Sequence, residues 1–229
     1  MWLNAQHSSA AALYHYRQQL LQARPRHLVI DQLFNPTQLQ AVRAILQQPT
    51  LWQSQQHTYE ALYVDANTWQ QTPLTERFVQ RDVWQRSNPL AEQPPHALAL
   101  EFLLFLRGPA FMSWLSRLFK VELTDRNLSN PSMNTNYFRL GPDDFIKQHA
   151  DDSPGREVCM LLYLNDDWQA GQGGELVFDG DTYPRVEIAP LFNRCILFDP
   201  AAPGTEHWVN ALIRSEEHTS ELQSRHNLG

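Results

Sequence analysis

Three side chains in the second half of the sequence combine residue types and spacing that suit a metal ion: His149, Asp151 and His207. His149 and Asp151 are two positions apart in a β-prone stretch, so their side chains can project from the same face of one strand. His207 lies in a second β-prone run and can supply the third ligand. Two imidazoles and one carboxylate leave coordination positions open, which suits non-haem iron(II) sites. An isolated His-X-Asp also occurs by chance, so the surrounding sequence has to support this prediction.

The elements that would position these side chains are short β-prone runs separated by turn residues. Seven such runs follow residue 134: NYFRL, FIKQHAD, EVCMLLYLN, GELVF, PRVEIA, RCILFD and HWVNALI. This pattern predicts an all-β barrel or jelly roll. Strand alternation places four apolar side chains in its core: Val186, Ile188, Ile196 and Phe198. We interpret Gly173 and Gly174 as structural residues that give backbone freedom at a turn.

The first half of the chain predicts helices and one strand. Residues 4–23 are rich in Ala, Leu and Gln and predict a surface helix. Residues 27–34 alternate as a strand does, and the Asn-Pro pair that follows provides a cap and a first-turn proline for the next helix. Residues 97–118 predict two helices with a Gly-Pro break, the first of them packed between the sheet and other helices. Residues 49–95 carry mixed signals and give no clear assignment.

Composition narrows the class of protein. The chain has 229 residues, of which 42% are hydrophobic and 11% aromatic, enough for one core and too short for two large domains. We see no apolar run of the length that spans a bilayer and no secretory signal. Two cysteines, Cys159 and Cys195, indicate reduced core thiols in a cytoplasmic protein rather than a disulfide. The net charge of −7 argues against a nucleic-acid partner, and the sequence does not indicate an oligomeric state.

The stretch from Asn134 to Ile213 resembles the prolyl-4-hydroxylase-like branch of the Fe(II)/2-oxoglutarate dioxygenases. The resemblance rests on the pieces GPDDFIKQHADD, GREVCMLLYLNDDW, GGELVF, FNRCILFD and EHWV, which occur in the family's order and at about its spacing. It implies an α+β fold with a mainly β core, a double-stranded β-helix (jelly roll) buttressed by N-terminal helices. It also implies three regions: a helical and mixed support over 1–125, the catalytic core over 126–213, and a tail over 214–229.

The same resemblance implies a chemistry for the candidate site. Fe(II) would be bound by His149, Asp151 and His207, with 2-oxoglutarate and O₂ in the open positions and ascorbate as a supporting reductant. The reaction would hydroxylate a prolyl or other residue in a peptide or protein and release succinate from 2-oxoglutarate. A metal site of this kind needs no side-chain nucleophile.

The far carboxylate of 2-oxoglutarate needs a cation, which in such relatives is an Arg that opens the last core strand. Arg214 is the nearest candidate, although it follows His207 early. Arg139 and Lys147 are fallback cations, because each lies an even number of residues from the first His of the motif. Tyr137 is the closest match to a tyrosine that holds the co-substrate in the family.

Two arginines near the motif have competing interpretations. Arg156 matches a position of the family, but an arginine at the start of a strand can equally bind a neighbouring aspartate. Arg194 is predicted to anchor a turn in preference to contacting a substrate.

The sequence after Ile213 departs from the family. RSEEHTSELQS resembles the translation of a short-read sequencing adapter and contains no β-prone run. We therefore interpret 214–229 as a non-native tail, with the last core strand and the co-substrate arginine missing. This chain would then be an inactive truncation of an enzyme. The alternative is a natural polar tail.

Two other functions stay open. One is hydroxylation of a small molecule of the amino-acid type by the same chemistry, and the other is a non-catalytic jelly roll that binds a metal or ligand. Retention of all three ligands favours catalysis over simple binding. A peptide hydroxylase should have an open groove beside the metal, whereas a small-molecule enzyme should cover its pocket with a loop, for which residues 49–95 are the candidate.

Overall fold

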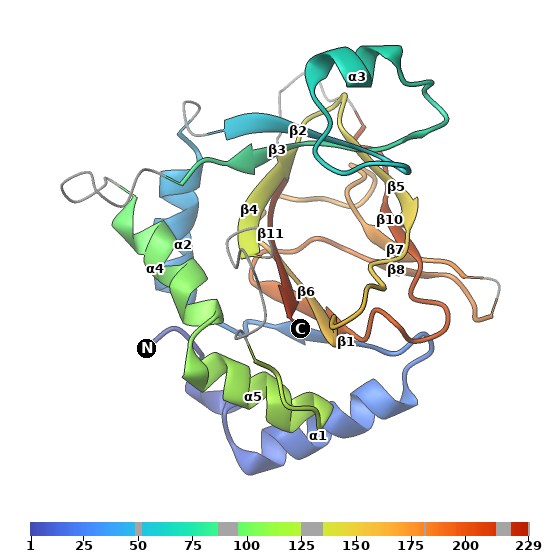
Figure 1. Ribbon diagram of the computed structural model, residues 1–229. Coiled ribbons are helices and arrows are strands. Elements are labelled where there is room, and N and C mark those ends of the chain that lie inside the picture. Colours follow the sequence, from blue (N-terminus) through green and yellow to red (C-terminus); the bar gives the residue numbers. More distant parts are fainter. Residues whose placement is uncertain (49–51, 87–95, 125–134, 181, 214–220, 229) are drawn as a thin grey trace.

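A computed structural model describes residues 1–48, 52–86, 96–124, 135–180 and 182–213, together with the backbone of 221–228 (Figure 1). Its helices are η1 (Ala5–His7), α1 (Ala10–Gln22), α2 (Pro36–Leu46), α3 (Ala66–Gln71), α4 (Ala97–Leu106) and α5 (Pro109–Phe119). Its strands are β1 (His27–Asp31), β2 (Trp52–Thr58), β3 (Arg77–Trp84), β4 (Thr135–Leu140), β5 (Phe145–His149), β6 (Val158–Tyr163), β7 (Leu176–Phe178), β8 (Val186–Ile188), β9 (Arg194–Phe198), β10 (His207–Val209) and β11 (Glu221–Leu228).

The strands curl into a double-stranded β-helix with helices on one side (Figure 1). Hydrogen-bonded neighbours follow the order β1-β9-β6-β11-β4-β3-β5-β10-β7-β8, and β2 pairs with β3. Each of these pairings is antiparallel. The fold class predicted from the sequence is confirmed. All seven predicted strands are present; β4 begins one residue earlier than predicted, and the other six are shorter than predicted.

Local sequence determines where the N-terminal helices begin. Ser9 accepts a hydrogen bond from the backbone N–H of Ala12 at the start of α1, and Asn35 accepts one from Gln38 at the start of α2. Each bond satisfies an N–H that the first helical turn leaves without an intrahelical partner. Pro36 occupies the first turn of α2, where its missing N–H costs nothing. The predicted helices, strand and cap in this part of the chain are therefore confirmed.

Strand β6 divides the core into two layers. It is buried on both faces, as expected for a strand between helices and a barrel interior. Met160 and Leu162 belong to the larger cluster with the helices, whereas Leu161 and Tyr163 pack into the barrel with four side chains predicted as core: Val186, Ile188, Ile196 and Phe198. This alternation gives the barrel an apolar inner wall on which a polar site can be built.

The two cysteines lie on opposite faces of this sheet. Cys159 faces the barrel interior and Cys195 packs with the helices, and neither forms a disulfide. Burial raises the pKa of the Cys159 thiol to about 12 and that of Cys195 further, so both remain protonated at neutral pH. The prediction of reduced core thiols is confirmed.

Helices α4 and α5 form a stretch, Ala97–Phe119, that is long and apolar enough to cross a membrane by length and composition alone. The sequence analysis expected no such stretch and is wrong here, because the break at Gly108 does not interrupt the apolar composition. Both helices nevertheless bury side chains such as Phe102 and Trp114 in the same cluster as β6. Core helices of soluble proteins pass the same test, and the predicted packing of this segment is confirmed.

The structure places β11 between β4 and β6, where the sequence analysis expected no strand. That part of the prediction is wrong. A strand forms there because β4 and β6 each present a row of backbone N–H and C=O groups to the space between them. An extended segment of any composition can satisfy those groups. Whether residues 214–229 are native is a separate question and stays a prediction, as do the three predicted regions.

Candidate metal centre

The three predicted ligands come together at one end of the barrel. His149, the last residue of β5, lies directly opposite His207 of β10 in the antiparallel register, and their ring centroids are 4.4 Å apart. Asp151 lies two residues beyond the end of β5. The expectation that His149 and Asp151 share one strand is therefore wrong in detail, although both side chains do meet. Cross-strand pairing, which sequence spacing does not show, supplies the second imidazole.

The hydrogen bonds of the two imidazoles fix which ring nitrogen faces the site. His149 Nδ1 lies 2.9 Å from the Lys147 carbonyl oxygen, and His207 Nδ1 lies 2.9 Å from that of Thr205. A carbonyl only accepts, so each Nδ1 carries the hydrogen and donates it. The Nε2 atoms then face Asp151, at 3.7 Å from Oδ1 for His149 and 3.6 Å from Oδ2 for His207. Such backbone-anchored imidazoles are typical of metal ligands.

Burial keeps the His207 imidazole in the form that binds metal. His207 is 2% exposed, and desolvation lowers its pKa to about 4, so the ring is neutral at physiological pH. The rings of Phe178 and Phe198 lie 5.9 and 5.1 Å from that of His207 and hold its orientation. A neutral, oriented imidazole has its Nε2 lone pair available for a cation.

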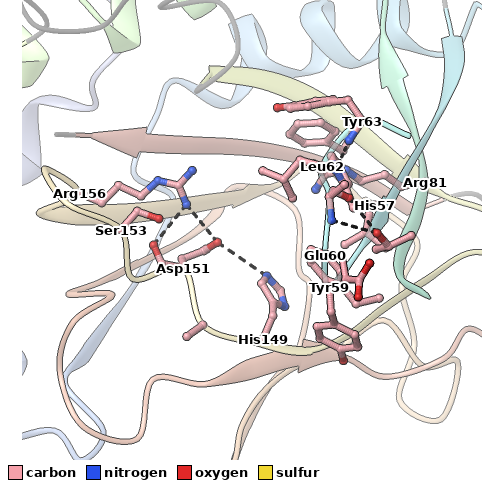
Figure 2. A pocket seen from close by; sticks show the side chains of 16 residues that line it. His57, Tyr59, Glu60, Leu62, Tyr63, Arg81, His149, Asp151, Ser153 and Arg156 are labelled. Atoms are coloured by element: carbon pink, nitrogen blue, oxygen red, sulfur yellow. Dashed lines mark hydrogen bonds and ion pairs between the residues drawn. The ribbon is translucent and has the colours of Figure 1, made fainter. Parts of the chain in front are cut away.

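Two neighbours hold the carboxylate of Asp151. Arg156 Nη1 donates to the Asp151 carbonyl oxygen at 3.2 Å and to its Oδ1 at 3.4 Å (Figure 2). The Cys159 thiol donates to Oδ2 at 3.4 Å. Arg156 therefore binds the neighbouring aspartate, as one of its two interpretations predicted. Arg194 likewise takes its structural role, because it pairs with Asp31 and donates to the Ala189 carbonyl.

The donor set fits a divalent iron. One candidate ligand atom from each of His149, Asp151 and His207 lies within 4.8 Å of the others. Bonds of about 2.0–2.2 Å place ligand atoms at right angles on one metal about 3 Å apart. Small inward rotations of these side chains would bring the ligand atoms to this separation of about 3 Å. Two imidazoles and one carboxylate occupy one face and leave the other positions for exogenous ligands, the arrangement of non-haem iron(II) oxygenases.

A cavity of about 430 Å³ opens beside this cluster. Its lining includes residues 57–63, Phe78, Val79 and Phe138. Figure 2 shows His149, Asp151 and Arg156 on one side of the cavity and His57, Tyr63 and Arg81 on the other. Tyr59, Leu62 and Tyr63 are between 48% and 58% exposed, so large apolar side chains border the mouth. The cavity is large enough for a small co-substrate together with part of a second molecule.

Tyr137 does not reach this cavity. Its side chain lies on the helix-facing side of β4, where its hydroxyl donates to the Ala99 carbonyl oxygen at 2.8 Å and its ring packs against Trp84. The next residue, Phe138, faces the cavity instead. Adjacent side chains on β4 point to opposite faces, so Tyr137 packs with the helices while Phe138 lines the site. The prediction that Tyr137 holds the co-substrate is contradicted by this position.

The predicted cations are also placed elsewhere. Arg139 shares the outer face with Tyr137 and pairs with Asp82, at 2.7 Å between Nη2 and Oδ2. Lys147 points away because β5 is irregular: His207 pairs with His149 and Val209 with Ile146, so two residues of β5, Lys147 and Gln148, oppose the single residue Trp208 of β10. This β-bulge reverses the alternation between Lys147 and the metal ligand. Arg214 lies outside the described residues.

Sequence reasoning missed three polar residues on the inner face. Tyr163 follows Cys159 at even spacing on β6, and its ring packs in the cluster whose phenylalanines contact His207. His57 and Arg81 line the cavity from the segment that gave no clear assignment. Even spacing from Cys159 could have identified Tyr163. The other two depend on pairing between distant strands, which leaves no local signal.

Comparisons with known proteins agree with this geometry. A family model described as the 2OG-Fe(II) oxygenase superfamily matches residues 133–220. The prolyl 3-hydroxylase OGFOD1 of Mus musculus is 27% identical over 146 residues, which cover 61% of this chain and 25% of that protein. The chain thus spans about a quarter of the length of this curated relative.

Solved structures share the fold. A prolyl-4-hydroxylase of Pseudomonas putida superposes with a TM-score of 0.58 at 14% identity, covering 94% of this chain and 97% of that one. A prolyl hydroxylase of Trichoplax adhaerens, in complex with a peptide fragment of hypoxia inducible factor, gives a TM-score of 0.58 at 16% identity, with coverages of 96% and 94%. At these identities the likeness shows the architecture.

Proposed function

Because a model of the 2OG-Fe(II) oxygenase superfamily matches residues 133–220, we propose that the chain is an Fe(II)- and 2-oxoglutarate-dependent hydroxylase of a prolyl or other residue in a peptide or protein. The family confirms the resemblance and the cofactors Fe(II), 2-oxoglutarate and O₂. The observation that carries the proposal is the cluster of His149, Asp151 and His207 at the cavity. A jelly roll that only held a ligand would not need a three-residue metal face that leaves positions open.

The chain's own residues prepare the site for this chemistry. Bound iron(II) would supply the oxidation: O₂ is the oxidant, one of its oxygen atoms would enter succinate as 2-oxoglutarate loses CO₂, and the other would enter a substrate C–H bond. His149 and His207 present their Nε2 atoms, and Asp151 provides the negative charge that a divalent cation requires. Arg156 and the Cys159 thiol orient that carboxylate. Such partners of the ligands set their geometry and hence the strength of metal binding.

The apolar wall of the cavity excludes water from the reacting atoms. Phe78 packs against His149 with ring centroids 5.5 Å apart, and Phe138 also lines the cavity. A dry cavity strengthens electrostatic contacts to the bound co-substrate and limits side reactions. The residues of this wall therefore position the substrate and shield it, and none of them has to move a proton.

The mouth of the cavity supports a polypeptide substrate. The segment between β2 and β3 borders it with exposed Tyr59, Leu62 and Tyr63, and Tyr59 donates a hydrogen bond to the Gln148 carbonyl beside the metal ligand. Exposed aromatic side chains at the edge of a concave site suit the apolar stems and backbone of a peptide. The relatives named for prolyl hydroxylation support the same substrate class. We also propose a cytoplasmic protein whose partners are neither nucleic acids nor membranes.

The test of the substrate class compares peptides with free amino acids. The protein is incubated with Fe(II), 2-oxoglutarate and ascorbate, and each candidate is analysed by mass spectrometry for the gain of one oxygen atom. We expect proline-containing peptides to be hydroxylated and free proline to be left unchanged. Hydroxylation of free proline or another free amino acid, with peptides unchanged, would establish the small-molecule alternative.

A further inference from the structure

A second cavity, of about 370 Å³, lies outside the metal site. None of the residues that the structure describes lines both this cavity and the one beside His149 and Asp151. Two arginines, one aspartate, one tyrosine and a short apolar run form its walls. We propose that this cavity binds a free α-amino acid with an apolar side chain. The site goes beyond the hydroxylase function, because no step of that function uses these residues.

The ends of β1 and β9 bring opposite charges to this cavity. The antiparallel register pairs His27 with Phe198, so Arg26 and Asp199 are the next residues beyond that pair on adjacent segments. Arg24 joins them from the segment between α1 and β1. Within the described part of the chain, neither arginine forms an ion pair with a carboxylate. These charged groups can therefore bind a ligand without breaking an existing pair.

Two of the charged groups are oriented by the backbone. Arg24 Nη1 donates to the carbonyl oxygens of Leu21 at 2.8 Å and Ala23 at 2.7 Å, at the end of α1, and its other N–H groups can donate to a ligand. Asp199 Oδ1 accepts a hydrogen bond from the Ala201 N–H at 3.0 Å, and Oδ2 can accept from a ligand. Groups that are oriented before a ligand arrives lose little entropy on binding it.

The rest of the lining is apolar. Ala202 and Pro203 belong to the turn that precedes β10, and the ring of Tyr183 packs on the backbone of the same turn. A Cβ at Gly204 would lie 2.8 Å from Tyr183 Cδ2, which shows how closely the ring approaches. An apolar side chain of moderate size would bury its surface against these groups.

The combination of charges favours a zwitterion. The guanidinium groups of Arg24 and Arg26 can bind a carboxylate through charge-assisted hydrogen bonds, and the Asp199 carboxylate can bind an ammonium group. An inorganic anion would also meet the negative charge of Asp199, which repels it. A free α-amino acid carries a carboxylate, an ammonium group and a side chain on one carbon atom, so it matches all three parts of the lining.

The test measures binding to the full chain without metal. The protein is titrated by calorimetry with L-leucine, with isocaproate, which lacks the ammonium group, with isoamylamine, which lacks the carboxylate, and with inorganic phosphate. We expect L-leucine to bind, and each of the other three compounds to bind on the order of 10-fold more weakly or less, because each loses a charge-assisted contact.

Two variants test the charged groups. We expect Arg26→Gln and Asp199→Asn each to weaken L-leucine binding on the order of 10- to 100-fold. Asp199→Asn keeps a side-chain oxygen for the Ala201 N–H, so the turn retains its hydrogen bond. The matched control is Arg185→Gln, which removes the same charge from a residue that pairs with Glu187 and does not line the cavity. This control should bind L-leucine as the parent does.

Thermal unfolding is measured for every variant, and if Asp199→Asn does not fold, Arg26→Gln carries the test. Absence of L-leucine binding to the parent, or unchanged binding to the folded variants, would overturn the proposal. Phosphate or isocaproate that binds as tightly as L-leucine would indicate a simple anion site and overturn it too. So would displacement of L-leucine by 2-oxoglutarate from Mn(II)-loaded protein, because the amino acid would then lie in the metal cavity. The hydroxylase assignment is tested separately, by turnover.

Discussion

At the scale of single residues, the side chains that would bind the metal are not the ones that stabilise the fold. His149, Asp151 and His207 lie at the end of the barrel and belong to none of the three apolar clusters. The two imidazoles are oriented by the backbone carbonyls of Lys147 in β5 and of Thr205, two residues before β10. The side chains therefore define a binding site on a scaffold that other residues stabilise.

Substitution of a ligand should remove metal binding and leave the fold. For His149→Ala or Asp151→Ala we expect loss of measurable Fe(II)-dependent activity, with thermal unfolding of the metal-free variant close to that of the metal-free parent. Metal titration and circular dichroism check both parts. Unfolding of either variant under conditions in which the metal-free parent stays folded would show that the site supports the barrel.

An ion pair at the sheet edge provides a pH-dependent contribution to stability. Arg194 Nε lies 2.6 Å from Asp31 Oδ1, and this hydrogen bond lowers the pKa of the Asp31 carboxyl below its usual value. The pair therefore stabilises the fold above the carboxyl's unfolded pKa, and this stabilisation is lost as pH falls through the folded pKa.

Asp31→Asn should reveal this dependence. The Asp31 side chain is 55% exposed, so solvent screens the pair and we expect only about 0.5 kcal/mol at neutral pH. The difference in free energy of unfolding between parent and variant should shrink toward zero at an acid pH below the lowered folded pKa of Asp31. Denaturant titrations at both pH values measure it, and a difference that grows on acidification would contradict the account.

At the scale of elements, turns and pairings decide what the sequence can reveal. Turn clusters and alternation predicted the seven strands that hold the ligands, because those signals are local. The same rules failed for Lys147, since a β-bulge before His149 reverses the alternation. They failed for β2 and β11, which are polar and depend on backbone pairing with distant strands. Most of the metal face was thus predictable, and the far wall of the cavity was not.

One turn is predicted to tolerate no side chain. Gly173 has φ +81°, and a Cβ there would collide with the Ala211 carbonyl oxygen. We expect Gly173→Ala to reduce the free energy of unfolding by at least about 2 kcal/mol, through backbone strain and this contact. Denaturant unfolding measures the change. The matched control is Gly171→Ala, at φ +90° with open space around its Cβ, which should cost less.

At the scale of the whole molecule, helices pack on one face of the sheet and stabilise it, and the cavity lies on the other side. Helices α1, α2, α4 and α5 cover the outer face of the sheet that contains β6, and the larger apolar cluster lies between them (Figure 1). The inner face of the same sheet holds the second cluster and the wall beside His207. The fold thus supports a rigid, partly dry site that opens on one side to a substrate.

The most direct test of the account is succinate formation from 2-oxoglutarate with added Fe(II) and ascorbate, measured for the parent chain, for His149→Ala, and for a chain whose residues after Ile213 are replaced by the last strand of an active relative. We predict Fe(II)-dependent succinate release, and we expect His149→Ala to abolish it. If 214–229 serves as the last strand, the parent chain releases succinate. If it does not, only the chain with the replaced strand does. Absence of succinate from both chains, although both bind the metal, would contradict the assignment as an oxygenase and favour a binding protein.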